Sequence, residues 1–424
     1  MEGVAPPFRH PGARSTDAAM SSTRTPPVRL PAAATVRAAL PWLAVIGVVL
    51  VAFNMRTAIA QIPPVLPDLG LSAGAQSVLA TVPVICFGLA ALASPALRGW
   101  LGEERVVLAV LVVLLAGVVL RSAWPNGALG LFTGTVLAGC AIAVMNVLVP
   151  SLVRRRFPGH VGLMTGVYTT SLVAGGAIAA GVTVPLRDGS GGSLHVALGI
   201  WAIPIALAIL VWLPQRRHGA LPVVAGGAEA LRALGRNPIA WQVTLFMGLQ
   251  SLLYYAPLSW LPAIDRDRGI DPATAGLLLS VLNLISIPTT FIAPLIAHRM
   301  RDQRLAVAGS SALTAVGLLG ILLAPASTAL VWVLILGIGQ GGTLSLALLM
   351  IVMRAGDDET AARLSTMVQG LGYLMAATGP LVMGLLHSAT GAWSIPLIWL
   401  IVMSVLMGCV GVLAGRARTV SAPR

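Results

Sequence analysis

The residues of this sequence best suited to bind a solute are polar side chains that stand inside long apolar stretches. One is a guanidinium and the others are amides or phenols: Arg56, Asn54, Asn146, Gln250, Tyr254, Asn283, Gln369 and Tyr373. A guanidinium binds carboxylates and other anions, whereas amides and phenols form hydrogen bonds with polar solutes. No nucleophile stands beside a base within these stretches, so the set predicts binding of a small molecule and not an enzyme.

Arg56 is the candidate that most needs a partner. It lies roughly 20 Å into the hydrocarbon layer if its helix enters near Leu43. Every aspartate and glutamate of the chain falls in a loop, a tail or the edge of an apolar stretch. Burying an unpaired guanidinium costs at least about 3 kcal/mol, and an anionic or strongly dipolar solute would supply the missing partner. Two other roles stay open, because Arg56 can also extend towards the headgroups or cap carbonyls where the helix breaks before Pro63 and Pro64.

The spacing of the candidates limits which of them can contact one ligand. Gln250 and Tyr254 are four residues apart, so they share one face of a helix. Asn54 lies about 200° around an ideal helix from Arg56, so both reach one cavity only if the helix is irregular. We expect Asn54 and Gln250 to form hydrogen bonds with the solute, and Tyr254 and Tyr373 to be walls or gates.

The composition requires that the elements holding these residues cross a membrane. Of the 424 residues, 57% are hydrophobic and 10% are charged, and the mean hydropathy is +0.90. Soluble proteins carry about 25% charged residues, so a surface this apolar must meet lipid. Twelve apolar stretches between residues 40 and 414 are long enough to cross a bilayer, which takes roughly 20 residues. We therefore predict an all-α membrane protein with twelve transmembrane helices.

The arginines orient these predicted helices. All 27 basic residues are arginine, and the formal net charge is +13. If both termini are cytoplasmic, the inner segments hold 22 arginines and the outer loops hold four: Arg121, Arg187, Arg266 and Arg268. Positively charged loops are retained inside, so we expect the cytoplasmic (inner) membrane with both termini in the cytoplasm. Arginines scattered over short loops also exclude nucleic acid as a partner, since no basic groove with stacking aromatics is formed.

The chain divides into two similar halves around its longest internal polar stretch. We predict a disordered cytoplasmic tail at 1–39, a six-helix bundle at 40–213, a cytoplasmic loop at 214–238, a second six-helix bundle at 239–414 and a cytoplasmic tail at 415–424. At an offset of about 200 residues, Arg105 matches Arg304 and Arg154 matches Arg354. Two parallel six-helix repeats are the arrangement of a major facilitator fold.

The polar residues also sort the twelve predicted helices into two kinds. The third, sixth, ninth and twelfth contain no Asn, Gln, Tyr or interior charge, whereas all the candidate residues lie on the others. In a major facilitator fold the helices at these four positions are peripheral, and the remaining eight line a central path. The pattern therefore supports the fold independently of the helix count.

We expect no metal, no cofactor and no further chain. Cys86, Cys140 and Cys409 are far apart in sequence and stand inside apolar runs, so they are interpreted as small core residues. The expected partners are the lipid bilayer and a small-molecule substrate, for which an anion is the first candidate. We expect a monomer.

Several segments resemble one group of the major facilitator superfamily. They are FNMRTAI (53–59), VPSLVRRRFP (149–158), QVTLFMGLQSLLYYAPLSWLP (242–262), AGLLLSVLNLISIP (275–288), RDQR (301–304) and GQGGTLSLALLMIVMRA (339–355). They are similar to the CynX/NimT group, and the resemblance covers nearly the whole chain apart from the N-terminal tail and the central loop. It implies transport of a small solute, with cyanate uptake and 2-nitroimidazole efflux as the named activities.

Three functions stay open at this point. The first is a secondary transporter of a small anion such as cyanate, which the uncompensated Arg56 favours. The second is an exporter of flat neutral heteroaromatic compounds of the 2-nitroimidazole type, which the tyrosines and amides favour. The third is a receptor or scaffold that shares the transporter fold and moves nothing. Neither the direction of transport nor a coupling ion follows from the sequence.

Overall fold

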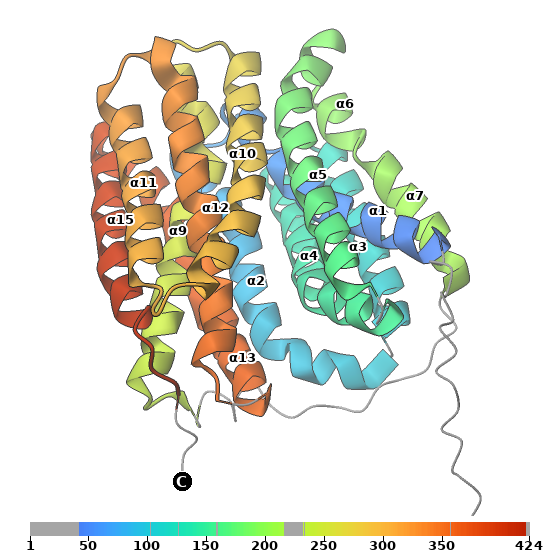
Figure 1. The fold of residues 1–424 in the computed structure, drawn as a ribbon. Helices are drawn as coiled ribbons and strands as arrows, with labels where there is room; N and C mark the ends of the chain where they lie inside the picture. Colours follow the sequence, from blue (N-terminus) through green and yellow to red (C-terminus); the bar gives the residue numbers. More distant parts are fainter. Residues whose placement is uncertain are drawn as a thin grey trace, which may run out of the picture. The chain divides into compact units, whose positions relative to one another are not determined.

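The computed structural model describes residues 42–101, 103–125, 127–157, 160–215, 232, 234–356 and 358–420. The predicted tail at 1–39 and most of the predicted loop at 214–238 lie outside these residues. The described residues are mostly helical (Figure 1). Residues 41–424 form one unit by their internal contacts.

The described chain runs through helices joined by short connections. Their bounds are α1 (Trp42–Ala60), η1 (Pro63–Leu69), α2 (Ala73–Leu101), α3 (Glu103–Ala123), α4 (Ala128–Arg156), α5 (Val161–Gly189), α6 (Leu194–Gly199), α7 (Ala202–Trp212), η2 (Leu213–Gln215), α9 (Pro238–Asp267), α10 (Pro272–His298), α11 (Arg304–Leu323), η3 (Ala326–Thr328), α12 (Ala329–Arg354), α13 (Asp358–Ala376), α14 (Thr378–Thr390) and α15 (Ser394–Ala414).

These helices account for the predicted membrane spans. Within the described residues, 11 helical segments are long and apolar enough to cross a membrane, and they match every predicted stretch but the seventh. The seventh is α9, which has 30 residues and is more polar because it carries two glutamines and two tyrosines. The eleventh span is divided into α13 and α14, because Pro380 has no N–H to donate to the Ala376 carbonyl. The prediction of an all-α membrane protein is confirmed.

The helices pack as two sets that touch along a few elements. We call α1–α7 the first half and α9–α15 the second half. The two halves meet where α5 packs on α10 and where α2 packs on α13 and α14, and Figure 1 shows α5 beside α10. By contrast, α3, α7, α11 and α15 pack on helices of their own half. These are the third, sixth, ninth and twelfth spans, which the sequence predicted to be peripheral; α1, α4 and α12 likewise pack on helices of their own half.

The internal repeat is visible as matching hydrogen bonds. In the first half, Arg155 at the end of α4 donates to Glu104 at the start of α3, at 2.6 Å. In the second half, Arg354 at the end of α12 donates to Gln303 just before α11. Each pair joins corresponding helices at one common offset close to 200 residues, and the partner of Arg354 in this repeat is Arg155, one residue after the Arg154 that the sequence predicted.

Each end of the helices carries its own ion pairs. At the end that we call the Asp68 end, Asp68 of η1 accepts hydrogen bonds from Arg187 of α5 and from Arg266 of α9, the latter at 2.9 Å. Because Arg187 belongs to the first half and Arg266 to the second, Asp68 links the two halves. We call the opposite end, where Glu104 pairs with Arg155, the Glu104 end.

One arginine does not lie where the sequence predicted. Arg121 was expected in an outer loop, but it lies in the last turn of α3 and is 1% exposed. The helix continues past its apolar stretch because the Arg121 guanidinium is surrounded by protein and not by water. The side-chain amide oxygen of Gln61 accepts a hydrogen bond from Arg121 Nη2.

The cysteines differ in part from the prediction of small core residues. Cys86 is buried, whereas Cys140 and Cys409 are exposed. The Sγ atoms of Cys86 in α2 and Cys140 in α4 are 3.6 Å apart, although the two residues are far apart in sequence. Within the described residues, no group of His, Cys, Asp and Glu is placed to hold a metal ion.

Close packing of α1 on α5 fixes the position of Arg56. A methyl group added at Gly175 of α5 would lie 2.3 Å from the carbonyl oxygen of Phe53 in α1. At the next residue, Gly176, an added methyl would lie 3.3 Å from the Cβ of Arg56. Glycine therefore lets the two backbones approach at the level of Arg56, as small residues do between membrane helices.

Replacing Gly175 should separate these two helices. We expect Gly175→Ala to lower the melting temperature of the detergent-purified protein by several degrees, because overpacking costs about 1–3 kcal/mol. Gly166→Ala in the same helix is the control, since its added methyl meets no atom within 4 Å. That variant should be as stable as the parent or more so, because alanine favours helix. Equal melting temperatures for the two variants would contradict the close contact.

Candidate functional site

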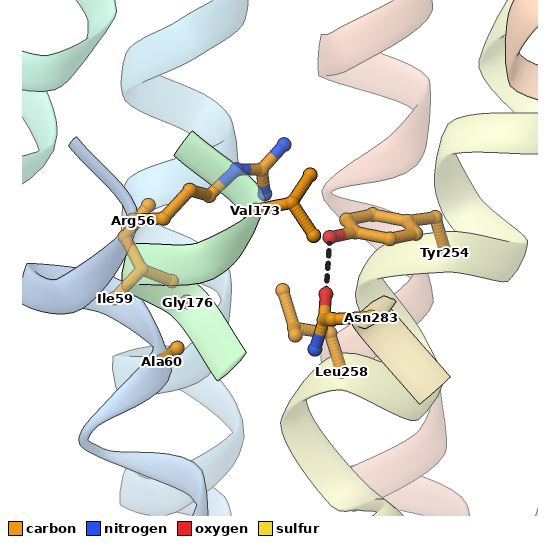
Figure 2. A pocket seen from close by; sticks show the side chains of 8 residues that line it. All are labelled: Arg56, Ile59, Ala60, Val173, Gly176, Tyr254, Leu258 and Asn283. Carbon is orange, nitrogen blue, oxygen red and sulfur yellow. Dashed lines mark hydrogen bonds between the residues drawn. The ribbon is translucent and has the colours of Figure 1, made fainter. Parts of the chain in front are cut away.

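A pocket lies between the two halves, with Arg56 on one side of it. It has about 250 Å³ of empty space, part of which is open to solvent. Its walls come from α1, α5, α9 and α10: Arg56, Ile59, Ala60, Val173, Gly176, Tyr254, Leu258 and Asn283. Figure 2 shows Arg56 facing Tyr254 and Asn283 across this space. Because both halves contribute to its walls, the pocket must change shape whenever the halves move relative to each other.

The guanidinium of Arg56 points into this pocket and not along α1 towards an end of the helix. Its Cζ lies 5.3 Å from the ring centroid of Tyr254 and 5.9 Å from that of Tyr255. These cation–π contacts stabilise the charge but do not neutralise it. Within the described residues no carboxylate forms an ion pair with Arg56, and its buried Nη1 has no hydrogen-bond partner. The site therefore holds an uncompensated positive charge.

A hydrogen-bonded pair faces Arg56 from the second half. Tyr254 Oη donates to Asn283 Oδ1 at 2.9 Å, as the dashed line in Figure 2 shows. Asn283 Nδ2 in turn donates to the Leu279 carbonyl at 2.9 Å. The amide is thus held from its own helix, α10, and it orients the phenol of α9. A phenol and an amide fixed in this way present a polar edge to a ligand on Arg56.

Aromatic rings enclose the other side of Arg56. Tyr255 of α9 lies 6.3 Å from Tyr373 of α13 between ring centroids, and Phe87 of α2 lies 6.0 Å from Tyr255. Together with Tyr168 of α5, all four tyrosines of the chain lie within electrostatic range of Arg56. The rings of Phe87, Tyr255 and Tyr373 come from three different helices, so with Tyr254 they form a wall that no single helix would supply.

Of the eight predicted residues, Arg56, Tyr254 and Asn283 line the pocket, and Tyr373 lies beside it in contact with Tyr255. The other four do not line the pocket. Asn54 turns away from it and donates to the Pro204 carbonyl of the neighbouring helix at 2.9 Å. This is the consequence of its angular offset from Arg56, because α1 stays a regular helix here.

The remaining three amides lie outside the pocket walls. Gln250 is 2% exposed and accepts a hydrogen bond from Ser251 at 3.1 Å. Gln369 donates to Ser365 of its own helix at 2.8 Å. Asn146 lies on α4 and is half-buried. Sequence reasoning also missed two residues of the aromatic wall, Tyr255 and Phe87, for which the only available signal was the adjacency of Tyr255 to Tyr254.

The chain matches known proteins over most of its length. The model of the Major Facilitator Superfamily matches residues 44–380. The uncharacterized transporter YycB of Bacillus subtilis (strain 168) is 40% identical over 384 residues, which is 89% of this chain and 94% of that protein. The 2-nitroimidazole transporter of Escherichia coli (strain K12) is 38% identical over 382 residues, 88% of this chain and 95% of that protein.

A third relative and a solved structure agree with this family. The cyanate transport protein CynX of Escherichia coli (strain K12) is 28% identical over 81% of this chain and 89% of its own length. A bacterial homolog of the human lysosomal transporter Spinster has a TM-score of 0.70 at 13% identity, covering 89% of this chain and 96% of that chain, and so shares the fold. The chain belongs to the Major Facilitator Superfamily, to its CynX/NimT group, and is a transporter of a small solute.

Proposed function

We propose that this transporter carries a small anion, cyanate being the first candidate, and that Arg56 is its anchor. The observation that carries the proposal is the uncompensated guanidinium in a pocket walled by both halves. Burial of that charge costs at least about 3 kcal/mol, and a bound anion offsets this cost. The hydroxyl of Tyr254 and the amide of Asn283 then contact the solute from the second half.

Alternating access follows from where the pocket lies. In a major facilitator fold the substrate site sits at the interface of the two repeats, which rock about it. Here Asp68 is the link that must break for the Asp68 end to open, since it binds Arg187 in one half and Arg266 in the other. The arginine distribution supports an Asp68 end on the outside of the cytoplasmic membrane, with both termini in the cytoplasm.

Export of a flat heteroaromatic compound is the second candidate. The wall of Tyr254, Tyr255, Tyr373 and Phe87 favours it, because aromatic rings stack on planar ligands. The relative named for 2-nitroimidazole is also more similar to this chain than CynX, at 38% against 28% identity. A nitro group has two oxygen acceptors for a guanidinium, so Arg56 would serve this ligand as well. A receptor that binds such a ligand without moving it is the third candidate.

Transport by purified protein tests these candidates. Proteoliposomes should accumulate labelled cyanate, and Arg56→Gln should reduce the initial rate at least tenfold, since one charge-assisted hydrogen bond is worth about 1.5–3 kcal/mol. The control is Arg299→Gln, which removes an exposed arginine at the end of α10 and should leave the rate unchanged.

The other candidates give different results in the same assay. Flux of 2-nitroimidazole without flux of cyanate would favour the heteroaromatic substrate. Binding of either compound, seen as thermal stabilisation, without any flux would favour the receptor. Cyanate flux that Arg56→Gln leaves unchanged would refute the anchor.

The anchor proposal also makes a prediction for stability. Arg56→Met should raise the melting temperature of the ligand-free protein by several degrees, because a neutral side chain of similar length removes the cost of an unpaired buried charge. Arg354→Met is the matched control. Arg354 is 2% exposed and donates from Nε to the Ala414 carbonyl at 2.9 Å and from Nη2 to Gln303, so its loss should destabilise the protein. A lower melting temperature for Arg56→Met would show that Arg56 is a structural residue.

Loss of the Asp68 link should favour opening of the Asp68 end. Asp68→Asn removes an ion pair between half-buried groups, worth on the order of 1 kcal/mol, so the open population should rise roughly fivefold. Spin labels are placed at Gly189 of α5 and Ser327 of η3 in a cysteine-free background. The distance between them, measured by double electron–electron resonance, reports the separation of the halves.

Asp188→Asn is the control for this measurement. Asp188 also pairs with Arg187, at 2.8 Å, but its side chain is 58% exposed and the pair lies within the first half. The distance distribution should therefore not change in that variant. An unchanged distribution in Asp68→Asn as well would show that Asp68 does not hold the two halves together.

A further inference from the structure

A second guanidinium is buried in the first half without a charged partner. Arg121 is 1% exposed, and within the described residues no carboxylate forms an ion pair with it. The other arginines near the Asp68 end differ, since Arg187 and Arg266 bind Asp68 and Arg268 donates to the Ala324 carbonyl. Arg121 is therefore a buried charge that the transport site at Arg56 does not use.

Arg121 borders a pocket of its own. This pocket has about 410 Å³ of empty space, part of which is open to solvent, and 13 residues from α1 to α4 and from α9 line it. Ten of these residues are apolar or glycine, and the polar ones are Arg121, Thr135 and Ser259. The walls thus suit a compact apolar body that carries one polar group.

Two hydrogen-bond donors at this pocket have no acceptor. They are the buried Nε of Arg121 and the buried Oγ1 of Thr135. A buried donor without a partner has lost its hydrogen bonds to water and gained none in return, so two beside one pocket need an explanation. Water would satisfy the hydrogen bonds but leave the charge uncompensated, whereas an anion satisfies both.

The environment of Arg121 holds the side chain in place and leaves this donor free. With its amide turned so that both ends are satisfied, Gln61 directly after α1 accepts from Arg121 Nη2 and donates to the Leu198 carbonyl at 3.1 Å, so the guanidinium is oriented by a neutral group. Arg354 shows what a structural arginine looks like in this chain, since its Nε donates to the Ala414 carbonyl. The corresponding nitrogen of Arg121 is the one without a partner.

The two pockets are neighbours, and the side chain of Ile59 lies between them. Ile59 of α1 lines both, and α9 contributes Leu258 to the Arg56 pocket and Ser259 to the Arg121 pocket. The Arg56 pocket is otherwise bounded by α5 and α10, and the Arg121 pocket by η1, α2, α3 and α4. The second pocket is therefore separate from the first, but it borders the same two helices.

We propose that the Arg121 pocket binds a second small anion, a monocarboxylate with a compact apolar body. Its oxygens accept hydrogen bonds from Arg121 Nε and Thr135 Oγ1, and its apolar part contacts the leucine, proline and alanine walls. This inference does not depend on the role of Arg56 in transport.

Benzoate binding to a protein that lacks the first anchor tests the proposal. Equilibrium dialysis of purified full-length Arg56→Gln with labelled benzoate should show one site per chain, and no site in Arg56→Gln/Arg121→Gln. Benzamide, which has the same shape without the charge, should not compete. No benzoate binding to Arg56→Gln, or equal binding after Arg121→Gln, would overturn the proposal. Failure of the Arg56 anchor is seen separately, as cyanate uptake that Arg56→Gln leaves unchanged.

A gentler variant separates binding from folding. Thr135→Val in the Arg56→Gln protein removes a hydroxyl that has no partner, so the ligand-free melting temperature should stay the same or rise, while benzoate should bind about tenfold more weakly. Thr133→Val is the control on the same helix, because Thr133 is exposed and bonds to the Leu129 carbonyl. Its benzoate affinity should not change. Unaltered affinity in Thr135→Val would show that the anion does not occupy this pocket.

Discussion

A single positive charge without a counterion organises the centre of this protein. In a medium of low dielectric constant such a charge acts strongly on the dipoles around it, since little solvent screens it. The phenols of the chain gather around Arg56 from both halves, and the Tyr254–Asn283 pair faces it. The apolar helices at the periphery need no such groups, because they contact only lipid and their own half.

Small residues on α5 connect this charged centre to the contact between the halves. On one face, Gly175 lets α5 approach the backbone of α1 beside Arg56. Further along, a methyl at Gly181 would lie 2.8 Å from Ser280 of α10, whose Oγ donates to the Ala177 carbonyl at 2.7 Å. One rigid helix thus touches both the anchor helix and the opposite half, so displacement at the α5–α10 contact reaches the pocket directly.

The number of membrane helices and the presence of a charge inside one of them were predictable, because the length of an apolar run and a charge inside it are properties of the sequence alone. Which of the amides point into the pocket was not predictable. The amide N–H groups of Asn54 and Gln369 donate to a carbonyl and to a hydroxyl of neighbouring protein. An amide with two N–H donors obtains such partners more readily than a guanidinium with five. Arg121 was missed because a charge at the end of an apolar run resembles a loop residue until its neighbour Gln61 is seen. Contacts such as Phe87 with Tyr373 depend on the rotation of one helix against another, which no local pattern encodes.

The carboxylate of Asp68 is shared unequally between the two halves. If the halves part as proposed, Asp68 stays paired with Arg187, which lies in the same half, and Arg266 loses its partner. The group set free is a guanidinium at the end of a helix, where water can hydrate it at once. Opening therefore leaves no unpaired carboxylate in an apolar layer. To close again, Arg266 only has to re-form its ion pair with Asp68, which Arg187 already holds in position.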